Sequence, residues 1–331
     1  MPGILIATDD GLLEVIPGEE PERILAGHQV SDVDYRDGLA AAVVPGEGVW
    51  VHLSDEWKAI ARWRDADGWT QVWEGDARSI RVAPGGELYI GGAPPAVFVL
   101  YPGAQEANEL GAFRGALRAS EGQQNANSSV TPVASGTEVS AVGFPDNGPE
   151  ETLYVAVEGG GVWCAPDPGA NLQFEKFEKR SSGLSPDVSG LWVHPERADR
   201  LFASTASGFY RSDDSGRTWL QSISGLDRSR AGNVVVIPGA PDALVMGCAR
   251  REPDLDGALF RSANGGVSWT RIMLEGEDEW EHAPLVAKLW DSPDTLFAVA
   301  GDKIWGSHDG GRGWVPLAED LPRAYALAPA L

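Results

Sequence analysis

The sequence of 331 residues contains little sulfur and little lysine: two cysteines, three methionines, and only five lysines among 26 basic residues. Two cysteines cannot form the disulfide framework of a small secreted domain. No apolar run approaches the roughly 20 residues that a transmembrane helix needs. The first nine residues lack the basic and long apolar regions of a signal peptide. We therefore expect a cytoplasmic protein that does not act at a membrane.

Acidic residues are abundant, with 49 Asp and Glu and a net charge of −23. Phosphate groups would meet a repulsive field, which argues against nucleic acid or an anionic membrane as a partner. A hydrophobic content of 43% is enough for a real core. Acid excess with arginine preferred over lysine is typical of a high-salt cytoplasm, so we expect a halophilic, haloarchaeal source. The alternative is an ordinary acidic protein from a GC-rich genome.

One phrase recurs seven times: an apolar run, a short glycine-rich loop, and a small residue followed by a large apolar anchor, as at residues 201–210 and 295–305. The anchors are Leu13, Trp50, Phe98, Trp163, Tyr210, Phe260 and Trp305. Steps near 40–50 residues match the size of a four-stranded propeller blade. The step from Phe98 to Trp163 is longer, at 65 residues.

Most of the phrases are preceded by another apolar run that ends in a turn, for example at residues 188–195 and 232–238. We interpret these runs as innermost strands and expect them to be buried on both faces. Residues 323–329 have the form of such a strand with nothing after it, and residues 3–13 supply a second and third strand without a first. Joined, the two ends make one blade and close the ring.

The predicted fold is therefore all-β: a single seven-bladed β-propeller of four-stranded antiparallel blades, closed by a C-terminal strand that pairs with the N-terminal blade. The expected blades are residues 323–331 with 3–26, then 27–75, 76–118, 137–180, 186–224, 231–274 and 283–318. Residues 119–136 are polar and of low complexity, and we expect them to form a mobile insertion. A lid or partner-binding arm and a plain tolerated insertion are both open for it.

A sharper pattern, S-x-[DN]-x-G-x-x-W, follows three of the anchors. Its recurring positions are Ser212, Asp214, Gly216 and Trp219, then Ser262, Asn264, Gly266 and Trp269, then Ser307, Asp309, Gly311 and Trp314. A worn copy lies at residues 65–69. Asp or Asn would accept backbone N–H bonds in a turn, glycine would supply unusual φ angles, and tryptophan would fill space between blades. We expect structural turns here, in preference to metal ligands or catalytic acids.

With this pattern the sequence resembles the Asp-box, or BNR, repeat superfamily of sialidase-like propellers. It includes sialidases, sortilin-type receptors, xyloglucan hydrolases and a seven-bladed photosystem II assembly factor. The resemblance implies that these turns lie on the rim away from the ligand face. The sialidase signature Arg-Ile-Pro is absent, because Arg23-Ile24 is followed by Leu25. One propeller also cannot build the cleft between two propellers that xyloglucan hydrolases use.

Other catalytic and metal-binding motifs are missing. The sequence has no phosphate loop, no G-x-S-x-G and no H-E-x-x-H, and its five histidines lack metal-ligand spacing. We expect His194 to be structural. Cys164 and Cys248 fall in blades that are not adjacent, so we expect free, buried thiols. No metal and no cofactor are predicted.

Propellers bind at the face that carries the loops entering each inner strand and the loops joining the second and third strands. The arginines that map to this face are Arg78, Arg228, Arg230, Arg250, Arg251 and Arg323. Guanidinium suits carboxylate or phosphate, and Trp280 would be able to stack on a ligand. The alternative is that these arginines pair with neighbouring acids such as Asp227 and Asp254.

We therefore expect a monomeric, non-catalytic binding or assembly platform that uses this face for an acidic protein partner or a small anionic ligand. The alternative is an enzyme, a glycoside hydrolase or lyase of sialidase-like type. Its acids would converge at the channel mouth, and the candidates are Glu281, Asp227 and Asp32.

Overall fold

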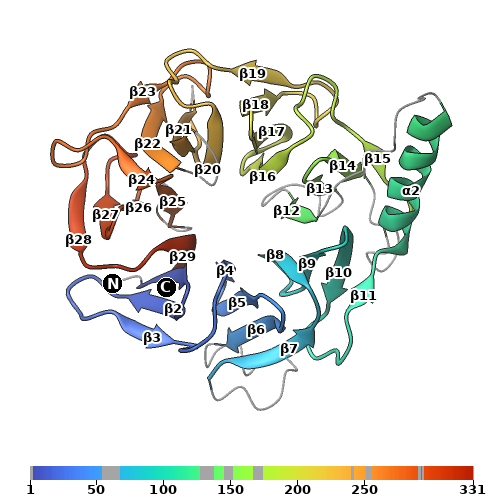
Figure 1. Ribbon diagram of the computed structural model, residues 1–331, viewed down its shortest axis with the longest axis horizontal. Coiled ribbons are helices and arrows are strands. Elements are labelled where there is room, and N and C mark those ends of the chain that lie inside the picture. Colours follow the sequence, from blue (N-terminus) through green and yellow to red (C-terminus); the bar gives the residue numbers. More distant parts are fainter. Residues whose placement is uncertain are drawn as a thin grey trace.

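The computed structural model describes residues 3–53, 68–126, 138–144, 152–166, 174–239, 242–250, 255–289, 292 and 294–330. Within these ranges the chain forms seven antiparallel sheets arranged in a ring, and the two ends of the chain lie side by side in one sheet (Figure 1). The predicted seven-bladed, four-stranded ring is confirmed. We number the blades 1–7 from the blade that holds both ends.

The strands of the first three blades are given from the channel outward. Blade 1 consists of β29 (Ala324–Ala330), β1 (Gly3–Thr8), β2 (Gly11–Val15) and β3 (Glu22–Ile24). Blade 2 consists of β4 (Asp32–Arg36), β5 (Leu39–Val44), β6 (Gly48–Leu53) and β7 (Thr70–Glu74). Blade 3 consists of β8 (Ala77–Val82), β9 (Leu88–Gly92), β10 (Ala96–Leu100) and β11 (Asn108–Glu109).

The other four blades follow in the same order. Blade 4 consists of β12 (Val139–Gly143), β13 (Leu153–Val157), β14 (Gly161–Ala165) and β15 (Glu178–Lys179). Blade 5 consists of β16 (Val188–His194), β17 (Arg197–Thr205), β18 (Gly208–Ser212) and β19 (Leu220–Ser222). Blade 6 consists of β20 (Arg230–Ile237), β21 (Ala243–Ala249), β22 (Leu255–Ser262) and β23 (Thr270–Arg271), with β24 (Trp280–His282) paired to β22. Blade 7 consists of β25 (Leu285–Lys288), β26 (Leu296–Ala300), β27 (Lys303–Ser307) and β28 (Val315–Ala318).

Blade 1 closes the ring as predicted, because β29 pairs antiparallel with β1 from Gly3↔Ala330 to Thr8↔Ala324. The C-terminal strand thus supplies the innermost strand that the N-terminal segment lacks. This pairing removes the free edge that β1 would otherwise present. The seven anchor residues all fall in the third strand of their blades, also as predicted.

The second strand of each blade carries the core. Strands β1, β5, β9, β13 and β26 are buried along their whole length. Their side chains contribute to the apolar clusters that fill the space between adjacent blades. The innermost strands differ from our prediction: Ser189 and Arg78 are exposed and Trp192 is half-buried. These strands are less buried because one edge borders the channel, whereas each second strand has a strand on both sides.

A helix occupies part of the segment that we expected to be a mobile insertion. Helix α2 (Gly111–Ala126) lies on the outside of the ring beside β10 and β15 (Figure 1). Phe113 and Leu117, four residues apart, are buried against Trp163 and Phe177, and the ring centroids of Phe113 and Phe177 are 5.2 Å apart. This helical spacing gives the segment an apolar stripe. The predicted loop is therefore wrong for residues 119–126, and residues 127–136 lie outside the described residues.

The three S-x-[DN]-x-G-x-x-W segments form tight turns between the third and fourth strands of blades 5, 6 and 7. In the first turn, the Ser212 hydroxyl donates to Asp214 (2.8 Å) and accepts from the N–H of Gly216 (2.9 Å). Asp214 also accepts from the N–H (2.8 Å) and hydroxyl (2.6 Å) of Thr218. The other turns repeat the contacts of the serine with Asn264 and Asp309. Residues 65–67 of the worn copy lie outside the described residues.

The glycine and tryptophan of each turn also have structural roles. Gly216, Gly266 and Gly311 have φ angles of 80°, 83° and 77°, which favour glycine. The Trp219 indole N–H donates to the carbonyl of Arg180 in blade 4 (3.0 Å), and that of Trp269 donates to Ser222 in blade 5 (3.2 Å). The turns of blades 5 and 6 therefore stabilise the junctions between blades, whereas the Trp314 indole N–H donates to the carbonyl of Gly311 within its own turn (3.2 Å).

Replacing Asp214 by alanine should destabilise the fold, because it removes the acceptor of three hydrogen bonds. We expect the free energy of unfolding to fall by about 1–3 kcal/mol, measured by urea denaturation at neutral pH. Glu19→Ala, at an exposed acid on the same rim, is the control and should change stability by less than about 0.5 kcal/mol. Equal effects of the two substitutions would contradict a structural role for this turn.

Candidate functional site

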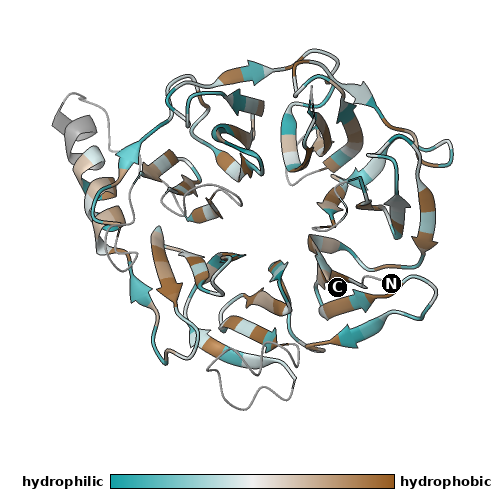
Figure 2. Cartoon of the chain, turned by 180° about the vertical axis from the view of Figure 1, so that it is seen from behind, coloured by the Kyte–Doolittle hydropathy of each residue, from teal (hydrophilic) through white to brown (hydrophobic). Residues whose placement is uncertain are grey.

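A cavity occupies the central channel of the ring. It has a volume of about 370 Å³, and all seven innermost strands line it. One end, the mouth face, carries the loops that enter the innermost strands together with the loops joining second and third strands, because antiparallel neighbours alternate their connections between the two ends. The turns of blades 5–7 lie at the opposite end. Figure 2 shows the ring from behind with its apolar strands between polar loops.

Side chains of the innermost strands hydrogen-bond to the backbone of the next blade. Asp32 and Asp34 accept from the N–H groups of Ile80 (2.9 Å) and Val82 (2.8 Å) in blade 3. The other contacts of this kind are Ser79 to the carbonyl of Val139 (3.0 Å), Ser140 to the carbonyl of Val188 (2.6 Å), and Asn233 to the N–H of Val286 (3.0 Å). These contacts pair backbone groups that face the channel and have no strand beside them.

A shift of register recurs near the mouth in five innermost strands. It falls at Arg78 in β8, Ser140 in β12, Ser189 in β16, Gly232 and Asn233 in β20, and Tyr325 in β29. A bulge redirects a side chain that regular pairing would hold on the other face. The bulges therefore bring a ring of polar side chains to the mouth of the channel.

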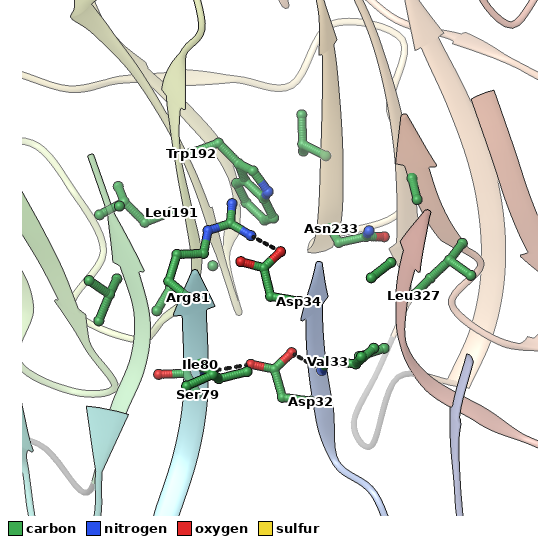
Figure 3. A pocket seen from close by; sticks show the side chains of 18 of the residues that line it. Asp32, Val33, Asp34, Ser79, Ile80, Arg81, Leu191, Trp192, Asn233 and Leu327 are labelled. Carbon is green, nitrogen blue, oxygen red and sulfur yellow. Dashed lines mark hydrogen bonds and ion pairs between the residues drawn. The ribbon is translucent and has the colours of Figure 1, made fainter. Parts of the chain in front are cut away.

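Two carboxylates of β4 face the channel on successive levels (Figure 3). Asp34 forms an ion pair with Arg81 (3.3 Å). Asp32 lies nearer the mouth, and among the described residues no basic side chain lies within 4 Å of its carboxylate. Burial by the surrounding wall raises the pKa of Asp32 to about 7. Burial also raises the pKa of Asp34, although the charge of Arg81 opposes this rise.

Trp192 supplies the large aromatic surface of the channel wall. Its indole lies over Gly190, where a Cβ atom would come 2.3 Å from the ring. Any larger residue at position 190 would displace the indole, so this glycine sets the position of the ring in the channel. Figure 3 shows Trp192 beside the ion pair of Arg81 and Asp34.

Two of the predicted mouth arginines are paired with acids. Arg78 lies 3.1 Å from Asp76 and 3.4 Å from Glu138. The Arg228 side chain is 1% exposed and contacts Asp227 (3.0 Å) and Glu279 (2.7 Å). Its Nε also donates to the carbonyl of Asp256 (2.7 Å). The pairing alternative therefore describes both arginines, and Arg228 is a buried structural residue.

The other predicted arginines are spread around the ring. Arg230 is half-buried at the start of β20, and Arg250 is exposed after β21. Arg323, in blade 1, is exposed with its guanidinium 5.0 Å from the ring centroid of Tyr325. Arg251 and the acid Asp254 lie outside the described residues. The described arginines thus come from blades 1, 3 and 6 and do not form one cluster.

Trp280 and the candidate acids are also placed apart. Trp280 is 8% exposed and packs in the apolar cluster between blades 6 and 7, so its ring is not free to stack on a ligand. Glu281 is exposed on β24, and Asp227 is paired with Arg228 and Arg271. Asp32 lies in blade 2. The three acids therefore have separate surroundings.

The remaining candidate residues are structural. His194 Nδ1 accepts from the N–H groups of Glu196 (3.0 Å) and Arg197 (3.1 Å), and its Nε2 lies 3.1 Å from the buried Asp242. Cys164 and Cys248 are free and buried, and burial raises their pKa values to about 11 and 12. The described residues contain no group of three side chains suited to a metal ion.

The sequence-based prediction missed Asp34, Arg81 and Trp192. An indication of the first was present in residues 32–36, Asp-Val-Asp-Tyr-Arg, which alternate between polar and apolar as a strand with one solvated face does. Which blades would face each other across the channel is not encoded in any local pattern.

The fold and channel define a seven-bladed β-propeller. No family model and no curated protein matches the chain. Similar solved structures include a GH74 xyloglucanase from Xanthomonas campestris (TM-score 0.62, 15% identity, 88% of this chain and 45% of that one). Another is YCF48 bound to D1 peptide (TM-score 0.59, 16% identity, 92% of this chain and 89% of that one). A third is a putative 6-phosphogluconolactonase from Bacteroides fragilis (TM-score 0.63, 10% identity, 100% of this chain and 98% of that one).

These identities are low, so the likeness extends to the fold alone. The chain spans less than half the length of that xyloglucanase and of a GH74 enzyme from Niastella koreensis that it also matches. The described residues contain no helix long and apolar enough to cross a bilayer.

The stability of the protein should depend on the protonation of Asp32. Its pKa in the folded state, about 7, lies above the ordinary value of 3.8. Between these values the folded chain keeps a proton that the unfolded chain loses, so stability falls as pH rises. The Asp32→Asn variant has no carboxyl at this position, so it lacks this fall in stability with rising pH. Relative to wild type, the variant should gain roughly 1–3 kcal/mol between pH 4 and 7.5, because each pKa unit corresponds to about 1.4 kcal/mol and channel water screens part of it.

Urea denaturation at a series of pH values measures this difference. Asp302→Asn, which removes an exposed mouth-face carboxylate outside the channel, is the control and should follow the wild-type profile. A difference between Asp32→Asn and wild type that is constant with pH would contradict the raised pKa.

Proposed function

We propose that this propeller is a non-catalytic binding platform whose mouth face takes a segment of a protein partner. The observation that carries the proposal is the state of the charged groups at the channel. Asp32 and Asp34 already accept backbone N–H bonds that join blades 2 and 3, and Arg78 and Arg228 are held by acids. Such groups are fixed in place, which suits recognition more than proton transfer. YCF48, a propeller of similar fold, has been solved with a bound peptide.

The charge of the mouth face favours a basic partner segment. Acidic residues in its loops outnumber the arginines discussed above: Asp9, Asp10, Asp76, Glu138, Glu158, Asp187, Asp227, Asp278, Glu279, Asp302 and Asp320. Arginines that are paired with acids leave little positive potential for an anion. We therefore prefer a basic segment to the acidic partner or anionic ligand that the sequence suggested. The first hypothesis predicts that basic peptides bind, and the second predicts that acidic peptides bind.

A set of short labelled peptides, graded in net charge from acidic to basic, tests both the platform and the sign. We expect basic peptides to bind saturably in fluorescence anisotropy and acidic ones not to bind. Asp187→Asn combined with Asp302→Asn, two exposed mouth-face positions, should weaken binding about two- to fivefold, because each removes one attractive charge.

Glu19→Gln combined with Glu20→Gln is the matched control, because it changes the net charge equally but lies on the opposite rim. It should leave affinity unchanged. Equal weakening by both double variants would indicate non-specific attraction to an acidic protein and contradict the mouth-face site. Binding of acidic peptides alone would restore the arginine hypothesis, with Arg78, Arg250 and Arg323 as the residues to substitute.

A second candidate function is glycoside hydrolysis, and the raised pKa of Asp32 favours it. A carboxyl with a pKa of about 7 is suited to act as a general acid near neutral pH. A screen of aryl glycosides at low and high salt tests this function. If the channel is catalytic, turnover should fall by at least about 100-fold in Asp32→Asn. Absence of turnover in the wild type would leave the binding platform as the better account.

A further inference from the structure

The side chains that join neighbouring blades at the channel are of two kinds. In blades 3, 4 and 6 a neutral serine or asparagine makes the contact, through Ser79, Ser140 and Asn233. In blade 2 two aspartates do so, although an asparagine would also be able to accept an N–H bond. A buried carboxylate is costly in this position unless its charge is matched. Holding the blades together therefore does not explain why blade 2 has ionisable aspartates where other blades have neutral residues.

The charge of Asp34 has an explanation inside the protein, because Arg81 neutralises it at 3.3 Å. Among the described residues no basic side chain contacts Asp32, although the charge of Arg81 acts on it from farther away and tends to lower its pKa. Its two oxygens accept from the N–H groups of Val33 and Ile80, each at 2.9 Å, which fixes the carboxylate in place. Each oxygen keeps acceptor capacity that faces the cavity. Asp32 is thus a positioned carboxylate at the mouth end of the channel, without a counter-ion.

The surroundings of Asp32 suit an organic cation more than a metal ion. Val33 and Ile80 flank Asp32 in the cavity wall but are only 5% and 4% exposed, and the half-buried Leu327 lies at the level of Asp34 (Figure 3). Such walls can hold an alkyl chain but offer no further ligands to a metal. Among the described residues, the other ionisable groups that line this end of the cavity are Asp34 and Arg81, which form an ion pair, and Tyr325, whose hydroxyl donates to Asp9 (2.6 Å). Arg78, at the rim of the neighbouring blade, is paired with Asp76 and Glu138.

The far end of the channel has the opposite character. Arg36 ends β4, and Lys288 ends β25, where its ammonium lies 3.3 Å from the carbonyl of Val236. Both line the cavity. The channel therefore carries a carboxylate toward the mouth and bases toward the exit. An entering cation would be attracted by the carboxylate at the mouth. At the exit, Arg36 lies 3.8 Å from Asp37.

We propose that the mouth end of the channel is a binding site for an alkylammonium or alkylguanidinium group, which forms an ion pair with Asp32 while its alkyl chain extends along the channel wall toward Leu327. The group belongs either to a free small amine or to a basic side chain of the partner. The second source rests on the proposed function, whereas the first is independent of it.

Isothermal titration calorimetry with n-butylammonium tests the site directly. We expect saturable binding in the millimolar range, because the ligand is small, and no saturable binding of butan-1-ol or butyrate at the same concentrations. Asp32→Asn should weaken n-butylammonium at least tenfold. The matched control Glu19→Gln removes the same charge from an exposed position on the opposite rim and should leave the affinity unchanged. Absence of saturable binding, or equal effects of the two variants, would overturn the proposal.

A measurement on the wild-type protein does not depend on the folding of any variant. The affinity for n-butylammonium should rise about tenfold from pH 6 to pH 8, because the Asp32 carboxyl ionises over this range. Calorimetry in two buffers of different ionisation enthalpy should show proton release on binding near pH 7. An affinity that is independent of pH would overturn the assignment to Asp32.

Two further arms distinguish the source of the cation. A lysine-containing peptide that binds the mouth face is compared with the same peptide acetylated on the lysine, and n-butylammonium is added as a competitor. If a partner side chain occupies the site, acetylation weakens the peptide and n-butylammonium displaces it. If n-butylammonium binds but does not compete, the ligand is a free amine. Peptide binding without any amine binding would overturn the channel site and leave the platform intact.

Discussion

The structure depends on how the seven innermost strands satisfy the hydrogen bonds of the backbone groups that face the channel. Each of these strands has a neighbour on one side only, and an unpaired strand edge exposes N–H and C=O groups. The side chains of Asp32, Asp34, Ser79, Ser140 and Asn233 reach the next blade and pair with such groups. Lateral hydrogen bonds therefore join blades that no sheet connects. The bulges near the mouth help, because they turn side chains toward the adjacent blade.

This constraint explains what the sequence could and could not predict. Second strands and anchors repeat because they fill the same space in every blade, so Trp50, Tyr210 and Trp305 were found by periodicity and lie in the expected strand. The Ser212 and Ser307 turns were equally clear, since their contacts are local in the chain. Innermost strands face the channel, where serine, asparagine and aspartate meet the same requirement. They share no motif, and their burial was predicted incorrectly.

Features that depend on contacts between distant segments also escaped the sequence. Phe113 and Leu117 are buried only because blade 4 presents Trp163 and Phe177 to helix α2. Without that surface the segment is a short polar stretch with little reason to fold. Trp280 was expected at a ligand because it lies in a segment that leads into an inner strand on the predicted ligand face, but β24 pairs with β22 and places the ring in the core. Arg228 was expected to be exposed for a similar reason.

Charge in this protein is therefore informative only where it is unmatched. A chain with a net charge of −23 has acids near most of its arginines. Arg228 is an example, because it is buried and forms ion pairs with two carboxylates. The two acids of β4 can be compared in the same way, and they differ in whether a base pairs with them. Asp34 is explained by Arg81, whereas Asp32 performs a task that serine or asparagine performs in other blades and bears in addition a desolvated charge. Asp32 is therefore less favourable for stability than the serine or asparagine residues that make the same contact in other blades. Such a residue indicates a role other than stabilising the fold.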